Sequence, residues 1–95
     1  MFKEKSKKEK TRIVVQCDVG FANSLYVRGE GIPHLNWEKG TPLKNVKADE
    51  WVWETDEPFK AGEFKVLIND QTYEVGENHP IHPGSSIRLN PKFPN

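Results

Sequence analysis

The 95-residue sequence predicts an all-β domain, a two-sheet antiparallel β-sandwich of immunoglobulin-like size with about seven strands. Three observations indicate this fold class. Short segments alternate between two faces at the period of a strand. Turn-forming residues recur about every 8–12 residues, the spacing that is typical of such sandwiches. No segment carries apolar residues at the 3.6-residue period of a helix.

The predicted strands span residues 12–18, 24–29, 43–46, 51–55, 63–68, 72–75 and 86–89. The first strand alternates Ile13 and Val15 with residues of the opposite face, and the second does the same with Leu25 and Val27. Glycine and proline mark residues 29–40 as a loop. The third strand is short and begins at the first apolar residue after this loop.

Aromatic residues identify the strands that follow. Trp51 and Trp53 lie on one face of a single strand, and we expect both in the core because the chain has few aliphatic residues to fill a sandwich. The next strand is the clearest, since Phe64 and Val66 alternate with residues of the other face. The last strand, residues 86–89, alternates polar with apolar side chains.

A hairpin turn is predicted after the fifth strand, but its register stays open. Asn69 and Asp70 both tolerate positive φ, as hairpin turns require. A turn of these two residues places Tyr73 on the core face. A turn of three residues places Tyr73 on the outer face with Lys65, because a shift of one residue exchanges the faces. Gln71 favours the longer turn, since glutamine is a poor core residue.

The charge pattern divides the chain into three parts. Residues 1–10 hold five lysines and two glutamates, and we expect a disordered basic arm there. Residues 11–90 form the predicted sandwich, and residues 91–95 an extended tail with two prolines. The whole chain has 14 basic and 14 acidic residues, so we expect no nucleic-acid partner.

Length and hydropathy exclude further classes. A chain of this size buries about 60–65% of its unfolded surface, which leaves one thin core and no deep cleft. We therefore expect a protein that is not an enzyme. No apolar run approaches the roughly 20 residues that cross a bilayer, and no secretory signal is visible. The expectation is a cytoplasmic protein without a membrane partner.

The residue types that could hold metals or disulfides are sparse. Cys17 is the single cysteine, so no intrachain disulfide is possible, and its place in the alternating pattern predicts a buried structural thiol. His79 and His82 are three residues apart, but Pro80 and Pro83 exclude the helix that would align them. We expect these histidines in a solvated loop, with no metal and no cofactor.

Four segments resemble a known family when they are taken in chain order. They are Tyr26-Val27-Arg28-Gly29, then Leu35-Asn36-Trp37 with Pro42-Leu43, then residues 64–70 (FKVLIND), and residues 72–78 (TYEVGEN). Their order and spacing are similar to those of the starch-binding carbohydrate-binding modules of families 20 and 48. With the flanking strands, the resemblance covers about Arg12 to Leu89. It implies a non-catalytic domain that binds an α-glucan of the starch or glycogen type.

The resemblance also implies the site residues. Trp37 and Tyr73 would form an aromatic platform, with tyrosine standing where the family usually has tryptophan. Lys65, Glu74 and Asn78 would bond the sugar hydroxyls. This chemistry suits a sugar, since a flat aromatic ring matches the C–H face of a pyranose. A lysine that donates, a carboxylate that accepts and an amide that does both match the hydroxyl rim.

Two further readings remain open. The resemblance implies a possible second sugar site at Phe21 and Trp51. Alternatively, the same sandwich is a protein–protein interaction domain that binds no sugar. Its loop aromatics would then be anchors, and its edge strands or lysine-rich arm would dock the partner. The expected partners are therefore an α-glucan or another protein.

Overall fold

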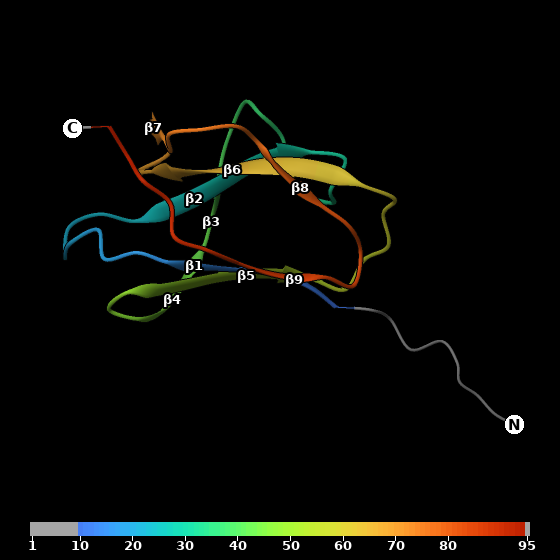
Figure 1. Cartoon of the computed structure of the whole chain (residues 1–95), viewed down its shortest axis with the longest axis horizontal. Coiled ribbons are helices and arrows are strands. Elements are labelled where there is room, and N and C mark those ends of the chain that lie inside the picture. Colours follow the sequence, from blue (N-terminus) through green and yellow to red (C-terminus); the bar gives the residue numbers. More distant parts are fainter. Residues whose placement is uncertain (1–9, 95) are drawn as a thin grey trace, which may run out of the picture.

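The computed structural model describes residues 10–94, and within this range the chain forms two facing β-sheets (Figure 1). The four-stranded sheet has the order β4 (Lys44–Lys47), β5 (Glu50–Thr55), β1 (Thr11–Gln16), β9 (Ser86–Leu89). The five-stranded sheet has the order β3 (Thr41–Pro42), β2 (Leu25–Glu30), β6 (Gly62–Ile68), β7 (Thr72–Tyr73), and β8 (His79–Ile81) also pairs with β6. The predicted all-β two-sheet sandwich is confirmed.

The structure corrects the strand count and one pairing. It contains nine strands in the described range, against about seven predicted. The two that the sequence did not indicate, β3 and β8, have two and three residues and each contains a proline, which restricts them to the edges of a sheet. All strand pairs are antiparallel except β1 and β9, which are parallel.

The core lies between the sheets and takes one face of each long strand. Phe64 and Val66 from β6 are fully buried, and Trp51 and Trp53 from β5 are 6% and 9% exposed. The core prediction for both tryptophans is therefore confirmed. The remaining members of this cluster are Ile13, Val15, Leu25, Val27, Ile32, Leu35, Leu43 and Ile81.

The hairpin between β6 and β7 has the longer of the two predicted turns. Leu67 pairs with Tyr73, so three residues form the turn. Asn69 and Asp70 have φ of 54° and 56°, the left-handed conformation that these residue types tolerate. This register places Tyr73 on the outer face of the five-stranded sheet, where it is 40% exposed.

The described residues at both ends of the chain contact the sandwich. The predicted basic arm lies outside the described residues except for Lys10, which contacts Glu54 of β5 through its ammonium group. Residues 90–94 form no strand, yet they are attached to the sandwich. Val75 N donates to Lys92 O over 2.7 Å, and Phe93 packs against the core. No helix occurs in residues 10–94, and hence none that is long and apolar enough to cross a membrane.

Candidate functional site

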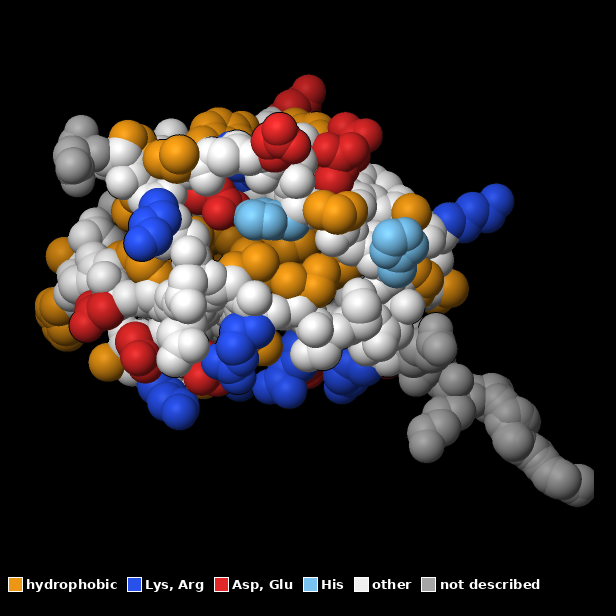
Figure 2. All heavy atoms as spheres, in the orientation of Figure 1, with side chains coloured by type: hydrophobic (Ala, Val, Ile, Leu, Met, Phe, Trp, Pro, Cys, Tyr) orange, Lys and Arg blue, Asp and Glu red, His pale blue; other side chains and the backbone are white. Residues whose placement is uncertain are grey.

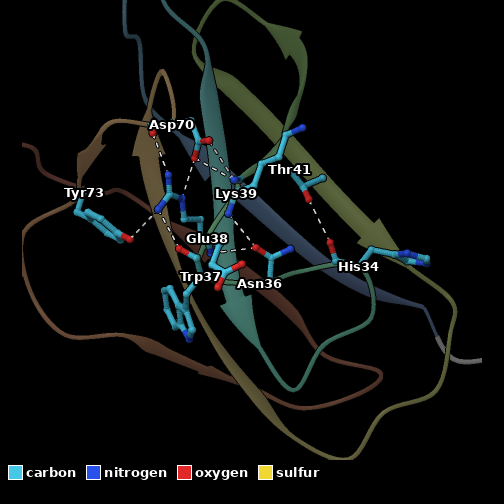
Figure 3. A network of polar contacts seen from close by, with 10 residues as sticks. His34, Asn36, Trp37, Glu38, Lys39, Thr41, Asp70 and Tyr73 are labelled. Carbon is cyan, nitrogen blue, oxygen red and sulfur yellow. Dashed lines mark hydrogen bonds and ion pairs between the residues drawn. The ribbon is translucent and has the colours of Figure 1, made fainter.

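The outer face of the five-stranded sheet brings together two aromatic residues that are far apart in the chain. Tyr73 ends β7, and Trp37 lies in the loop between β2 and β3. Figure 3 shows the hydroxyl end of Tyr73 directed toward the loop that carries Trp37. Trp37 is partly buried, and Tyr73 is exposed.

Arg28 on β2 joins these two residues. Its Nη1 donates to Trp37 O over 2.9 Å and to Tyr73 Oη over 3.1 Å. The guanidinium carbon also lies 5.6 Å from the centre of the Tyr73 ring. One nitrogen atom thus positions both the loop that carries Trp37 and the end of β7.

Asp70 in the hairpin turn completes this arrangement. Arg28 Nε donates to Asp70 Oδ1 over 2.8 Å, and Nη2 donates to Asp70 O over 3.1 Å. The carboxylate also accepts from Gly40 N, at 3.0 and 3.1 Å from its two oxygens. A Cβ on Gly40 would collide with Asp70 Oδ1, so a larger residue there would displace the carboxylate from these contacts. We call Arg28 and Asp70, with these contacts, the Arg28–Asp70 clamp.

The clamp is largely withdrawn from solvent, since the Arg28 and Asp70 side chains are 17% and 25% exposed. The hydrogen bond from Arg28 holds the pKa of the Asp70 carboxyl below its usual value, with Gly40 N–H assisting. The same bond raises the pKa of Arg28. Both groups therefore stay charged over the physiological pH range.

The lowered pKa of Asp70 predicts a loss of stability in acid. A carboxyl whose pKa is lower in the folded protein stabilises the fold above its unfolded value of about 3.9, and that contribution disappears as pH falls through the folded value. Urea denaturation of the native protein and of Asp70→Asn should therefore show a large difference in unfolding free energy at pH 6. The difference should shrink as the pH is lowered below about 4. A difference that stays constant down to pH 2 would contradict the prediction.

The loop of Trp37 is fixed at both its ends and its middle. Ile32 and Leu35 are buried in the core. Asn36 Oδ1 accepts from the backbone N–H groups of the two residues after Trp37, at 2.9 and 2.8 Å. Trp37 Nε1 donates to Glu30 Oε1 over 2.7 Å. The indole therefore bonds the protein through its polar edge.

Lys65 lies next to Tyr73 and Arg28. It pairs with Arg28 across β6 and β2, and its ammonium group is 5.9 Å from the centre of the Tyr73 ring. The ammonium donates to Gly76 O. Since lysine carries three donors, this bond leaves capacity for a hydroxyl group.

Glu74 occupies a different place from the one the resemblance implies. Its side chain is 3% exposed, and its Oε1 accepts from Val66 N over 2.9 Å and lies 2.8 Å from His79 Nε2. β7 and β8 both pair with β6, and Val66 falls between them. The carboxylate thus supplies the acceptor that a continuous strand would have supplied. It is a structural group, and this corrects its assignment as a sugar ligand.

Asn78 precedes β8 and lies at the surface. Its Nδ2 donates to Glu63 Oε1 over 2.7 Å. His79, which we expected in a solvated loop, instead lies on β8 with its ring centre 5.1 Å from that of Phe64. The loop expectation was wrong because His79 fills the space between Phe64 and Glu74.

Phe21 and Trp51, the possible second site, line one hollow of about 350 Å³. Phe21 is fully exposed, whereas Trp51 is 6% exposed and donates from Nε1 to Cys17 O over 3.2 Å. A sugar in this hollow could stack on Phe21 alone.

Cys17 is half-buried, and its burial, assisted by the charge of Asp18, raises the pKa of the thiol. Within residues 10–94 no group of three or more His, Cys, Asp or Glu side chains could hold a metal ion.

Sequence reasoning missed Arg28 and Asp70 as site residues. The alternation of β2 indicates that Arg28 faces away from the core, and Asp70 stands in a predicted turn. Neither observation indicates that the two meet. A signal was nevertheless present, because an arginine on an outer strand face near an aspartate turn is a possible ion pair once β2 is known to pair with β6.

Comparisons with known proteins add no further constraint. No protein-family model, no curated protein and no solved structure matches this chain.

Proposed function

We propose that the chain binds an α-glucan, without catalysis, on the outer face of the five-stranded sheet. The observation that carries the proposal is the joint attachment of Trp37 and Tyr73 to one nitrogen of Arg28. Two aromatic residues from separate segments are thereby held on one surface, as a sugar-stacking platform requires. The assignment to an α-glucan, rather than another sugar polymer, rests on the resemblance to starch-binding modules.

The surroundings of the pair also support the proposal. The polar edges of both rings are already bonded, to Glu30 and to Arg28, so the rings offer mainly apolar surface. Lys65 and Asn78 lie at the margin and can bond hydroxyl groups, as donor and as donor–acceptor. The face is open to solvent, and a single contact of this kind should bind with a Kd of about 10 μM to 1 mM.

Calorimetric titration with β-cyclodextrin or maltoheptaose tests the proposal. Trp37→Ala and Tyr73→Ala should each weaken binding about tenfold or more, because each removes one stacking surface. Tyr73→Phe keeps the ring and should retain most of the affinity. Phe21→Ala is the matched control, since it removes an exposed aromatic residue outside the platform.

Two outcomes would reject this site. The first is the absence of heat or fluorescence change at millimolar ligand with a folded protein. The second is a loss of binding in Phe21→Ala together with normal binding in Tyr73→Ala. If the protein binds no glucan but Trp37 is needed to retain a protein partner, the interaction-domain alternative would replace the proposal.

A further inference from the structure

The outer face of the four-stranded sheet carries an excess of positive charge. Five cationic side chains extend from it or from its margin: Lys10, Arg12, Lys44, Lys47 and Arg88. We call this surface the basic face. Figure 2 shows several Lys and Arg side chains along the lower side of the molecule, where the four-stranded sheet lies in Figure 1. Residues 1–9 add four lysines and two glutamates to the chain immediately before this sheet.

The carboxylates of the basic face do not neutralise it. Glu54 lies 3.5 Å from both Lys10 and Arg12, and Glu50 lies 3.9 Å from both Lys47 and Arg88. Two carboxylates are thus shared by four cations at distances longer than a charge-assisted hydrogen bond. A third, Asp49, lies in the turn between β4 and β5. Loose exposed pairs contribute little to stability, so the cations can exchange these partners for an incoming anion.

The heads of the cations are the outermost part of this surface. The side chains of Lys47 and Arg88 are 69% and 59% exposed, whereas their shared partner Glu50 is 16% exposed. Beneath them Val14 and Val52 are almost fully covered. Long cationic side chains therefore cover an apolar strip and present charge to the solvent.

A hollow of about 330 Å³ opens at the β4 side of the basic face. Its apolar lining comes from Pro42, Val46, Val52 and Trp53, and Arg12 and Lys44 flank it with Glu54. Val46 is 45% exposed. The hollow is large enough to take an apolar side chain, with two cations at its margin.

β4 is also an edge strand, paired on one side with β5. All four of its residues are exposed. Lysines on an edge strand discourage pairing with another edge of neutral or positive charge. The lysines would instead attract an extended acidic peptide. Such a peptide can add to an edge through main-chain hydrogen bonds while alternate side chains enter pockets.

We propose that the basic face docks an acidic, extended segment of another protein, which adds to β4 and places an apolar side chain in the hollow. Nucleic acid suits the surface less well, because the only aromatic residue lining the hollow, Trp53, is 9% exposed and offers no ring for base stacking. The basic face and the proposed glucan platform lie on opposite outer faces of the sandwich, so both ligands could be held at once.

An octapeptide of alternating glutamate and valine, labelled with a fluorophore, tests the proposal against the full chain by anisotropy. We expect a Kd of about 10–500 μM that weakens as salt is raised, because exposed charges are screened. A peptide of alternating lysine and valine should not bind. Saturating maltoheptaose should leave the affinity unchanged, and this readout does not depend on whether the chain binds glucan.

Matched variants locate the contact. Lys44→Glu/Lys47→Glu should weaken peptide binding about tenfold or more, and Lys60→Glu/Lys92→Glu, with the same change in charge away from this sheet, should leave it within about twofold. Val46→Ser should weaken it about threefold with no change in charge. Melting temperatures confirm that the variants fold.

Three results would overturn the proposal. They are the absence of peptide binding at about 1 mM, equal loss in both double variants, and tighter binding of oligo(dT) or phosphatidylserine vesicles than of the peptide. The last result would assign the basic face to a nucleic acid or to a membrane surface instead.

Discussion

Arg28→Met is expected to lower the free energy of unfolding by about 2–3 kcal/mol and to weaken glucan binding in the protein that remains folded. Methionine has a similar length but no donors. It therefore leaves Asp70, Trp37 O and Tyr73 Oη without the group that joins them. The loss is smaller than that for a fully buried pair, because the Asp70 side chain is 25% exposed.

Three measurements separate the two effects of this substitution. Urea denaturation gives the stability, and cyclodextrin titration gives the affinity. Iodide quenching reports on Trp37, because Trp51 and Trp53 are buried. The stability and the glucan affinity of Arg28→Lys should lie between those of the native protein and those of Arg28→Met. An ammonium group keeps the charge but cannot bond Asp70, Trp37 and Tyr73 together.

Arg12→Met is the matched control for Arg28→Met. Arg12 is 48% exposed and lies 3.5 Å from Glu54, so its loss should cost less than about 1 kcal/mol and leave glucan binding unchanged. Equal destabilisation by the two substitutions would show that the Arg28–Asp70 clamp has no special role. Native glucan affinity in a folded Arg28→Met protein would show that the platform does not depend on it.

Glu74→Ala is expected to destabilise the fold by about 3 kcal/mol. The substitution leaves the buried N–H of Val66 without an acceptor and removes the partner of His79. Because no strand covers β6 between β7 and β8, no main-chain group can replace the lost carboxylate. The denaturant midpoint should fall, with little change in the slope of the transition.

Two companion variants make the Glu74 result specific. Glu74→Gln retains an oxygen that can accept from Val66 N, so its cost should be about 1 kcal/mol. Glu77→Ala removes an exposed carboxylate a few residues away and should have almost no effect. If Glu74→Ala were as stable as Glu77→Ala while its glucan binding was lost, Glu74 would be a ligand after all.

Most of the fold could be predicted from the sequence, because apolar residues that alternate with polar ones mark the buried face of a strand. Phe64 and Val66 alternate with Lys65, and the structure buries the first two and leaves the third at the surface. The core prediction for Trp51 and Trp53 rests instead on their shared strand face and on the small number of aliphatic residues in the chain. β3 and β8 were missed because two or three residues are too few to show a period, and the proline in each of them argues against a strand.

For the candidate site, the sequence indicated which residue types are present, but not for every residue which way its side chain points. Tyr73 is exposed and Trp37 is partly buried. The face on which Tyr73 lies depended on the length of a turn that the sequence left open. The pairing of Leu67 with Tyr73 shows that this turn has three residues. Glu74 was assigned outward, but it points inward because β6 has an unpaired N–H at that position.

The sequence by itself determined where the main strands run, which face of each is apolar, and where the chain turns. These properties depend on neighbours within a few residues. Only the tertiary structure decided that β9 lies parallel to β1 and that Arg28 meets Asp70, 42 residues away. A charge pair of this kind stabilises the fold only after folding has brought both groups together and partly removed them from water. The clamp is therefore a result of strand order and register, which local pattern does not specify.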